Sequence, residues 1–217
     1  MNWPVERRKG SAQSLHDLQL PGRRGVWVLE VDRPTLVLGS TQTDSVLDAN
    51  RVVASGVAVA RRRSGGGVVG LRPGGSLWVD VVISSADEQW DADVGRSFRW
   101  VGAGWQGALI ALGARATMVT GPDRHRRWAD LVCFAGRNTG EVVVDGAKVV
   151  GLSQRRTRAW TRYQCLVLLD ADPTLVVDHL RLDEGQRQAM RRDLAEATGA
   201  VAFGADELLQ SFLGQLD

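Results

Sequence analysis

Several residue types are scarce in this chain of 217 residues, and each shortage excludes a class of protein. Two cysteines, Cys133 and Cys165, are too few for a disulfide framework. No apolar run is long enough for a membrane-spanning helix, and residues 1–24 contain no apolar segment of the signal-peptide type. The net charge of +2 is too small to indicate a nucleic-acid-binding protein. We therefore expect a cytoplasmic globular protein with no membrane or nucleic-acid partner.

Lysine is also scarce. Lys9 and Lys148 are the only lysines, and the other 25 of the 27 basic residues are arginine. A lysine offers a compact point charge on a flexible stem, whereas arginine offers a planar fork. Lys148, inside an ordered-looking segment, is therefore a candidate functional residue, although a solvent-exposed hairpin lysine gives the same pattern.

The apolar patterns predict an α/β (α+β) protein with a mixed, largely antiparallel sheet flanked by helices. Residues 1–24 are interpreted as an arm with one short helix near Ser14–Leu18, and residues 25–217 as a single domain without an accessory C-terminal domain. Asp145-Gly146 predicts a tight hairpin, and Gly121–Arg127 a polar loop. Strands are expected at Gly25–Val31, Thr35–Leu38, Val57–Ala60, Val68–Leu71, Ser76–Ile83, Asp130–Phe134, Glu141–Val144, Ala147–Leu152 and Tyr163–Leu169, and helices at Asp44–Ala54, Asp93–Leu112, Glu184–Ala197 and Ala205–Leu216.

A run of three glycines follows three arginines at residues 61–67. Consecutive glycines weaken regular structure and permit a positive φ or a close backbone approach. Their N–H groups can form a concave site for an anion, and the arginines raise the local positive potential. A flexible hairpin tip with solvated arginines is the alternative interpretation.

This loop resembles the Arg-Arg-x-Ser-Gly-Gly-Gly-x-Val signature of the lipoate-protein ligase A family, part of the superfamily of biotin and lipoate ligases. In that family the loop wraps an acyl-adenylate. An upstream Leu-Gly-x-x-Gln is also similar. The chain departs from the family pattern at Leu71-Arg72, where members carry His-Asp, and at Gly75, where they carry Asn. The matching residues are Leu38, Gly39 and Gln42 upstream, and Arg61, Arg62, Ser64, Gly65, Gly66, Gly67 and Val69 in the loop.

A second segment also resembles this family. Lys148 matches the lysine of its pattern. The pattern is a hairpin turn followed by Lys-Ile/Val-x-Gly-x-Ala/Ser-Gln-x-Arg. A preorganised ammonium stabilises the negative charge that develops on an acyl carbonyl under attack. The resemblance covers roughly residues 36–170 and implies the fold of the biotin ligase and class II synthetase catalytic domains. The matching residues are Lys148, Gly151, Ser153, Gln154 and Arg156.

The resemblance implies one leading activity. A ligase of this family activates lipoate or octanoate with ATP and Mg²⁺, then transfers the acyl group to a lysine of a lipoyl domain. Its acceptors are the lipoyl domains of 2-oxoacid dehydrogenase complexes or the glycine cleavage H protein. Gly67 favours this interpretation, because transferase relatives tend to carry arginine there. No metal site built from the protein's own residues is predicted.

Two alternatives stay open. Cys133-Phe134 lies eight residues before Glu141, and Glu141 lies seven before Lys148. This spacing resembles octanoyltransferases and amidotransferases that pass an acyl group from acyl carrier protein or a lipoyl domain through a cysteine thioester. Cys133 would then be the nucleophile, activated by nearby cations, although residues 131–134 also fit a plain buried strand. The other alternative is a non-catalytic acyl-binding paralogue.

Overall fold

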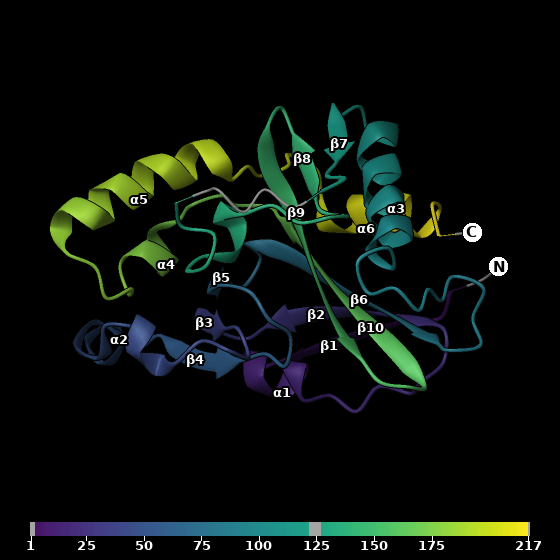
Figure 1. Cartoon of the computed structure of the whole chain (residues 1–217), viewed down its shortest axis with the longest axis horizontal. Coiled ribbons are helices and arrows are strands. Elements are labelled where there is room, and N and C mark those ends of the chain that lie inside the picture. Colours follow the sequence, from purple (N-terminus) through teal and green to yellow (C-terminus); the bar gives the residue numbers. More distant parts are fainter. Residues whose placement is uncertain (1–2, 122–126, 217) are drawn as a thin grey trace.

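Two sheets form the frame of the protein (Figure 1). The computed structural model describes residues 3–121 and 127–216. Its strands are β1 (Val5–Gly10), β2 (Gly25–Val31), β3 (Thr35–Leu38), β4 (Ala58–Arg61), β5 (Val69–Leu71), β6 (Ser76–Ser84), β7 (Ala116–Met118), β8 (Val142–Val144), β9 (Ala147–Arg156) and β10 (Trp160–Leu168). The larger sheet has the order β1-β2-β6-β10-β9-β8-β7, and the smaller one the order β4-β3-β5. Within the larger sheet β1 and β2 run parallel, and every other pair of described strands is antiparallel.

Helices cover the sheets in layers (Figure 1). They are α1 (Ala12–His16), α2 (Ala49–Ser55), α3 (Phe98–Ala111), α4 (Thr174–Val177), α5 (Glu184–Ala197) and α6 (Ala205–Leu213), with short 3₁₀ turns η1 (Asp44–Val46) and η2 (Cys133–Ala135). One face of the larger sheet packs against α3 and α6, which meet through stacked Trp105 and Phe212 rings, 3.9 Å apart. The other face packs against α1 and the smaller sheet, and α4 and α5 cover the far side of the smaller sheet.

The predicted fold class is confirmed, and several elements have the predicted bounds. Strands Gly25–Val31 and Thr35–Leu38 and helix Glu184–Ala197 are as expected. Residues 77–83 of β6 are buried without interruption, because this strand lies inside a sheet covered on both faces. At the predicted hairpin both Asp145 (φ 49°) and Gly146 (φ 83°) have the positive φ that a tight type I′ turn requires.

Several elements differ from the sequence predictions. The predicted helix Asp44–Ala54 is divided into η1 and α2, because Leu47 is extended and forms a bridge with Leu180. Val5–Gly10, placed in an arm by the sequence, forms edge strand β1 along β2. Its four charged residues hide the strand pattern and are typical of an edge. Strand β7 has only three residues, too few for a periodic signal.

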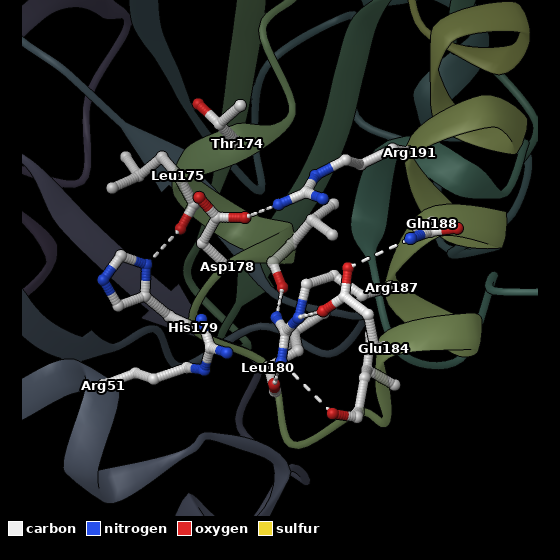
Figure 2. A network of polar contacts seen from close by, with 12 residues as sticks. Arg51, Thr174, Leu175, Asp178, His179, Leu180, Glu184, Arg187, Gln188 and Arg191 are labelled. Atoms are coloured by element: carbon white, nitrogen blue, oxygen red, sulfur yellow. Dashed lines mark hydrogen bonds and ion pairs between the residues drawn. The ribbon is translucent and has the colours of Figure 1, made fainter.

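A polar network fixes the helices behind the smaller sheet (Figure 2). The buried Arg187 side chain of α5 donates to the carbonyl oxygens of Val177, Leu180 (3.4 Å) and Leu182 (3.2 Å). His179 is also buried, with Nδ1 2.9 Å from the Leu175 carbonyl and Nε2 2.8 Å from the Ser55 hydroxyl of α2. Arg124 and Arg126 of the predicted polar loop Gly121–Arg127 lie outside the described residues. No helix in the described ranges is long and apolar enough to span a bilayer.

Candidate active site

A pocket lies between the smaller sheet and the larger one. It encloses about 460 Å³ when the space at its open mouth is included, a size typical of small-molecule sites. One wall is polar, and the rest is apolar apart from the Cys133 thiol. The lining residues are His16, Arg62, Ser153 and Gln164 on the polar side, and Val37, Val69, Leu71, Trp78, Cys133, Phe134, Gly151, Leu152, Cys165 and Leu166 elsewhere.

Lys148 lies beneath the Cys133 end of this pocket and is completely buried. Its ammonium is 2.7 Å from Glu141 Oε1 and donates to the carbonyl oxygens of Cys133 (2.9 Å) and Gly136 (3.1 Å). The Phe134 ring centroid is 4.8 Å from Nζ. The solvent-exposed interpretation of Lys148 is therefore wrong: the side chain points inward, holds residues 133–136 through two hydrogen bonds, and pairs with Glu141 through the third contact.

Glu141 is the counterion of Lys148 and is buried to the same degree. Besides the ammonium, its carboxylate accepts hydrogen bonds from the backbone N–H groups of Asn138 (2.8 Å) and Leu152 (3.3 Å). A buried ion pair is stable only when its remaining donors and acceptors are satisfied. The pair therefore ties together the 133–141 segment and strand β9.

Cys133 begins the turn that Lys148 holds. The predicted strand Asp130–Phe134 is wrong, because the chain pairs only through Val68 and Val132 and then curls into η2. The carbonyl of Cys133 consequently points to the ammonium, and its N–H donates to the Val68 carbonyl at 3.0 Å. The residue is partly exposed and lines the pocket.

The two cysteines have different environments. Cys165 is fully buried in β10, and burial raises the pKa of its thiol, so it stays protonated. Cys133 lies within the electrostatic reach of Arg62. Burial lowers the pKa of the Arg62 guanidinium, and the Cys133 sulfur opposes that shift. Of the two thiols, Cys133 is the partly exposed one, and its role as a nucleophile stays a prediction; Cys165 is a core residue, as expected.

The glycine loop is shaped by Arg62. Its guanidinium donates to the carbonyl oxygens of Gly65 (2.9 Å), Gly67 (2.8 Å) and Val37 (3.3 Å). Among the described residues, no group accepts a hydrogen bond from the N–H groups of residues 65–67. Because the carbonyl oxygens turn toward Arg62, the N–H groups are left available for an anion or a developing oxyanion. Anion binding by the loop, as predicted from the sequence, stays a prediction, and the support that Arg62 gives to the loop's carbonyl oxygens was not predicted.

Arg61 also supports the loop. It donates to the carbonyl oxygens of Gly39 (3.0 Å) and Gln42 and pairs with exposed Asp44 at 2.5 Å. The Gln42 side chain in turn accepts from the Gly39 N–H and donates to the Leu131 carbonyl. These residues, predicted from the Leu-Gly-x-x-Gln resemblance, join the loop to the segment that carries Cys133. Direct contact of Arg61 or Arg62 with a ligand stays a prediction.

The glycines of the loop serve different purposes. A Cβ on Gly67 would lie 2.6 Å from the Leu131 carbonyl carbon and the Val132 nitrogen, and one on Gly39 would lie 1.9 Å from the Gly66 oxygen. A Cβ on Gly65 would meet nothing within 4 Å. Gly67 is thus required by packing against residues 131–132. Its presence does not favour a ligase.

We predict that Gly67→Ala destabilises the fold, whereas Gly65→Ala leaves its stability nearly unchanged. Gly67→Ala should lower the free energy of unfolding by about 1–3 kcal/mol, because the backbone it touches cannot move aside cheaply. Gly65→Ala should change it by no more than about 0.5 kcal/mol. Urea unfolding followed by tryptophan fluorescence measures both. Equal unfolding midpoints for the two variants would contradict the packing role of Gly67.

Strand β9 divides the other predicted site residues between its two faces. Gly151 and Ser153 line the pocket. Gln154 instead donates to the Val94 carbonyl at 3.0 Å, and the Arg156 guanidinium stacks 4.0 Å from the Trp90 ring centroid and donates to the Asp91 carbonyl. Gln154 and Arg156 therefore fix the segment before α3 and are not brought together with Lys148 and Cys133.

The residues that replace the family's His-Asp pair have separate positions. Leu71 contributes an apolar side chain to the pocket. Arg72 turns away and donates to Asp172 (3.0 Å) and Thr174 (3.0 Å) near α4. Gly75 closes the turn before β6 by donating its N–H to the Arg72 carbonyl.

Two polar pocket residues, Gln164 and His16, were not predicted from the sequence. Ser64 donates to Gln164 Oε1 at 3.2 Å and lies 3.1 Å from the Ser153 hydroxyl. Gln164 then contacts His16 Nδ1 at 3.2 Å. The one available signal was a polar residue, Gln164, inside an otherwise apolar strand. His16 belongs to α1, which no spacing rule connects to this pocket.

The chain is similar to known acyl-handling proteins. A family model described as the lipoyl protein ligase A/B catalytic domain matches residues 13–198. Octanoyltransferase LipM of Kyrpidia tusciae is 30% identical over 172 residues, which are 76% of this chain and 62% of that protein. LipM of Symbiobacterium thermophilum is 30% identical over 173 residues, or 74% of this chain and 61% of that protein. The chain thus spans about three fifths of the length of these relatives.

Solved structures share the fold. A bipartite lipoate protein ligase from Thermoplasma acidophilum has a TM-score of 0.77 at 19% identity, covering 99% of this chain and 82% of that one. Lipoate-protein ligase A bound with ATP has a TM-score of 0.73 at 16% identity, covering 99% and 84%. At these identities the likeness establishes the architecture. The match of the family model over residues 13–198, together with this shared architecture, shows that the chain belongs to the lipoyl protein ligase A/B catalytic domain family.

Proposed function

We propose that this chain is a cysteine-dependent acyltransferase, which moves an octanoyl or lipoyl group from a carrier protein to a lysine of a lipoyl domain. The observation that carries the proposal is the position of Cys133. It lines the pocket and begins a turn that the buried Lys148 holds in place. The octanoyltransferase names of relatives at 30% identity support it. The sequence placed a ligase first, and the position of Cys133 reverses that order.

The reaction has two acyl-transfer steps. The Cys133 thiolate attacks the carbonyl carbon of the donor, a new C–S bond forms, and the donor's thiolate (or amine, with a proton) leaves. The ε-amine of the acceptor lysine then attacks the enzyme thioester. An amide bond forms, the C–S bond breaks, the amine loses a proton, and the Cys133 thiolate returns. Neither step consumes ATP.

The negative charge of each tetrahedral intermediate needs preorganised donors. The N–H groups of the glycine loop are one candidate set, because Arg62 engages the carbonyl oxygens of Gly65 and Gly67 and no described residue accepts from the loop's N–H groups. Lys148 lies beneath the Cys133 turn and does not line the pocket. Its three hydrogens are engaged, so it contributes through its charge and by fixing the Cys133 turn. We therefore assign Lys148 as a positioning residue in this mechanism.

An ATP-dependent ligase is the second candidate. The free N–H groups of the glycine loop fit a phosphate as well as an oxyanion. Arg61 already pairs with Asp44 and donates to backbone carbonyl oxygens. Arg62 donates only to carbonyl oxygens and keeps its charge in the pocket lining, where it would also suit a nucleotide phosphate. In a ligase, ATP with Mg²⁺ would supply an activated acyl phosphate bond.

The choice of donor tests the proposal. Purified protein is incubated with an apo-lipoyl domain and one of three donors: octanoyl-acyl carrier protein, an octanoylated lipoyl domain, or ATP with Mg²⁺ and free octanoate. We expect intact-mass spectrometry to detect acylated acceptor with a carrier-protein donor in the absence of ATP. Without acceptor, one octanoyl group should accumulate on the enzyme.

Each other outcome favours a named alternative. Modification only in the presence of ATP and the free acid would contradict the transferase and favour the ligase. No modification with any donor, for protein that is folded by circular dichroism, would favour an acyl-binding paralogue.

A further inference from the structure

His16 is the most tightly fixed polar residue of the pocket. Its ring lies 4.5 Å from the Trp78 ring, and its backbone carbonyl accepts a hydrogen bond from Arg162 at 3.1 Å. Arg162 is itself fixed by the fully buried Asp80, whose other oxygen accepts from Trp78 Nε1. The imidazole therefore has one orientation, set by residues of β6 and β10.

The hydrogen bonds also set the tautomer. Ser64 and Ser153 lie within hydrogen-bonding distance of Gln164 Oε1, which makes that atom the acceptor. Gln164 Nε2 is then the donor to His16 Nδ1. Burial, with help from the Arg162 and Arg62 charges, lowers the pKa of His16 to about 3, so the ring is neutral. A neutral imidazole whose Nδ1 accepts a hydrogen bond carries its proton on Nε2.

The Nε2–H group is buried and has no acceptor among the described residues. His16 is only 7% exposed, and it lines the pocket. A buried donor without a partner is destabilising, and few such groups survive in native structures without a functional reason. A ligand that fills the pocket and carries an acceptor near His16 would satisfy it.

The sheet register places His16 across the pocket from the Cys133 turn. Trp78, Leu166 and Gly151 are neighbours on β6, β10 and β9. His16 lies on Trp78, whereas the Phe134 ring lies on Gly151, where an added Cβ would be 3.0 Å from the ring. Two strand spacings, about 10 Å, separate these ends. An extended chain of eight carbons attached at Cys133 has a comparable length and would end near His16.

We infer that His16 selects the acyl group by its far end, so that the pocket favours a medium-length chain with a hydrogen-bond acceptor near its terminus over a purely hydrocarbon octanoyl chain. A lipoyl group has such acceptors in its dithiolane sulfur atoms, and an 8-hydroxyoctanoyl group has one in its hydroxyl oxygen. This inference rests on the proposed acyl-binding function and names the substrate that the site prefers.

Calorimetric titration of the full chain with octanoate, lipoate and 8-hydroxyoctanoate tests the inference without any transfer step. We expect the wild-type protein to bind the two acceptor-bearing acids about two- to tenfold more tightly than octanoate, the range of one neutral hydrogen bond. His16→Phe keeps a ring on Trp78 but removes the donor, so the three affinities should converge. His16→Gln restores an N–H donor and should restore the preference.

His179→Phe is the matched control, because His179 is similarly buried but has partners for both ring nitrogens, the Leu175 carbonyl and the Ser55 hydroxyl. None of these three residues lines the pocket. The control variant should keep the wild-type ratio of affinities, and circular dichroism verifies that each variant is folded. Equal wild-type affinities for the three acids, or a preference unchanged in His16→Phe, would overturn the role of His16 while acyl transfer continued. Absence of both binding and transfer would instead remove the proposed function itself.

Discussion

Cys133→Ser is expected to reduce acyl transfer by roughly three orders of magnitude or more, because removing the nucleophile of a covalent mechanism removes its central step. A serine hydroxyl at this position lacks a neighbouring general base among the described residues of the pocket, and an unactivated hydroxyl is a poor nucleophile. The variant should also fail to accumulate an acyl group in intact-mass spectra. Its stability should change little, since the Cys133 side chain is partly exposed and its structural contacts are made by its backbone.

Cys165→Ala is the matched control, since the chain contains only these two cysteines. Cys165 is fully enclosed in the core, with a pKa raised by burial. Its replacement should retain acylation of Cys133 and most of the transfer activity, at a modest loss of stability. Transfer by Cys133→Ser within tenfold of the wild-type rate would rule out the covalent mechanism through Cys133.

Lys148→Met should be the most destabilising single change at the site, lowering the free energy of unfolding by about 3–5 kcal/mol. It leaves the Glu141 carboxylate buried without a counterion and removes the donor from the Cys133 and Gly136 carbonyl oxygens. Lys9→Met is the control. Lys9 forms a solvent-exposed pair with Glu30, and such pairs contribute no more than about 1 kcal/mol. Chemical denaturation of both variants measures the difference.

The double variant Lys148→Met with Glu141→Gln separates stability from catalysis. Neutralising both partners removes the unpaired charge, so part of the lost stability should return. Transfer activity should not return, because the turn that presents Cys133 still lacks its ammonium donor. We expect a lower kcat with a smaller change in KM. Recovery of both stability and kcat would show that Lys148 has a purely structural role.

The regular elements were largely predictable because their cause is local. Helix Glu184–Ala197 has a capping box at Asp183 and Gln186, and its bounds follow from those residues. The Asp145-Gly146 hairpin follows from the backbone freedom of two residues. The predicted strand at Asp130–Phe134 was wrong because its carbonyl groups bind a lysine ammonium instead of a neighbouring strand. No periodic pattern encodes that contact.

The site was predictable where it depends on residue identity. The rarity of lysine and the triple glycine, with a family resemblance, identified Lys148 and the loop before any coordinates. The roles of Arg62 and Gly67 were not predictable, because each contacts backbone atoms that only the folded chain brings near. Gln154 and Arg156 follow the same motif as Ser153 but point to the opposite face of β9, since strand residues alternate.

The sequence by itself thus determined the fold class, the family resemblance and the candidate charged and nucleophilic residues. Tertiary structure alone decided which of them meet. It buried Lys148 against Glu141, placed Cys133 on a turn instead of a strand, and brought His16 to the far end of the pocket. The physical reason is that local propensity acts over a few residues. Burial, counterion pairing and backbone approach depend on the folded chain, whether the partners are near in sequence, as Glu141 and Lys148 are, or far apart, as His16 and Gln164 are.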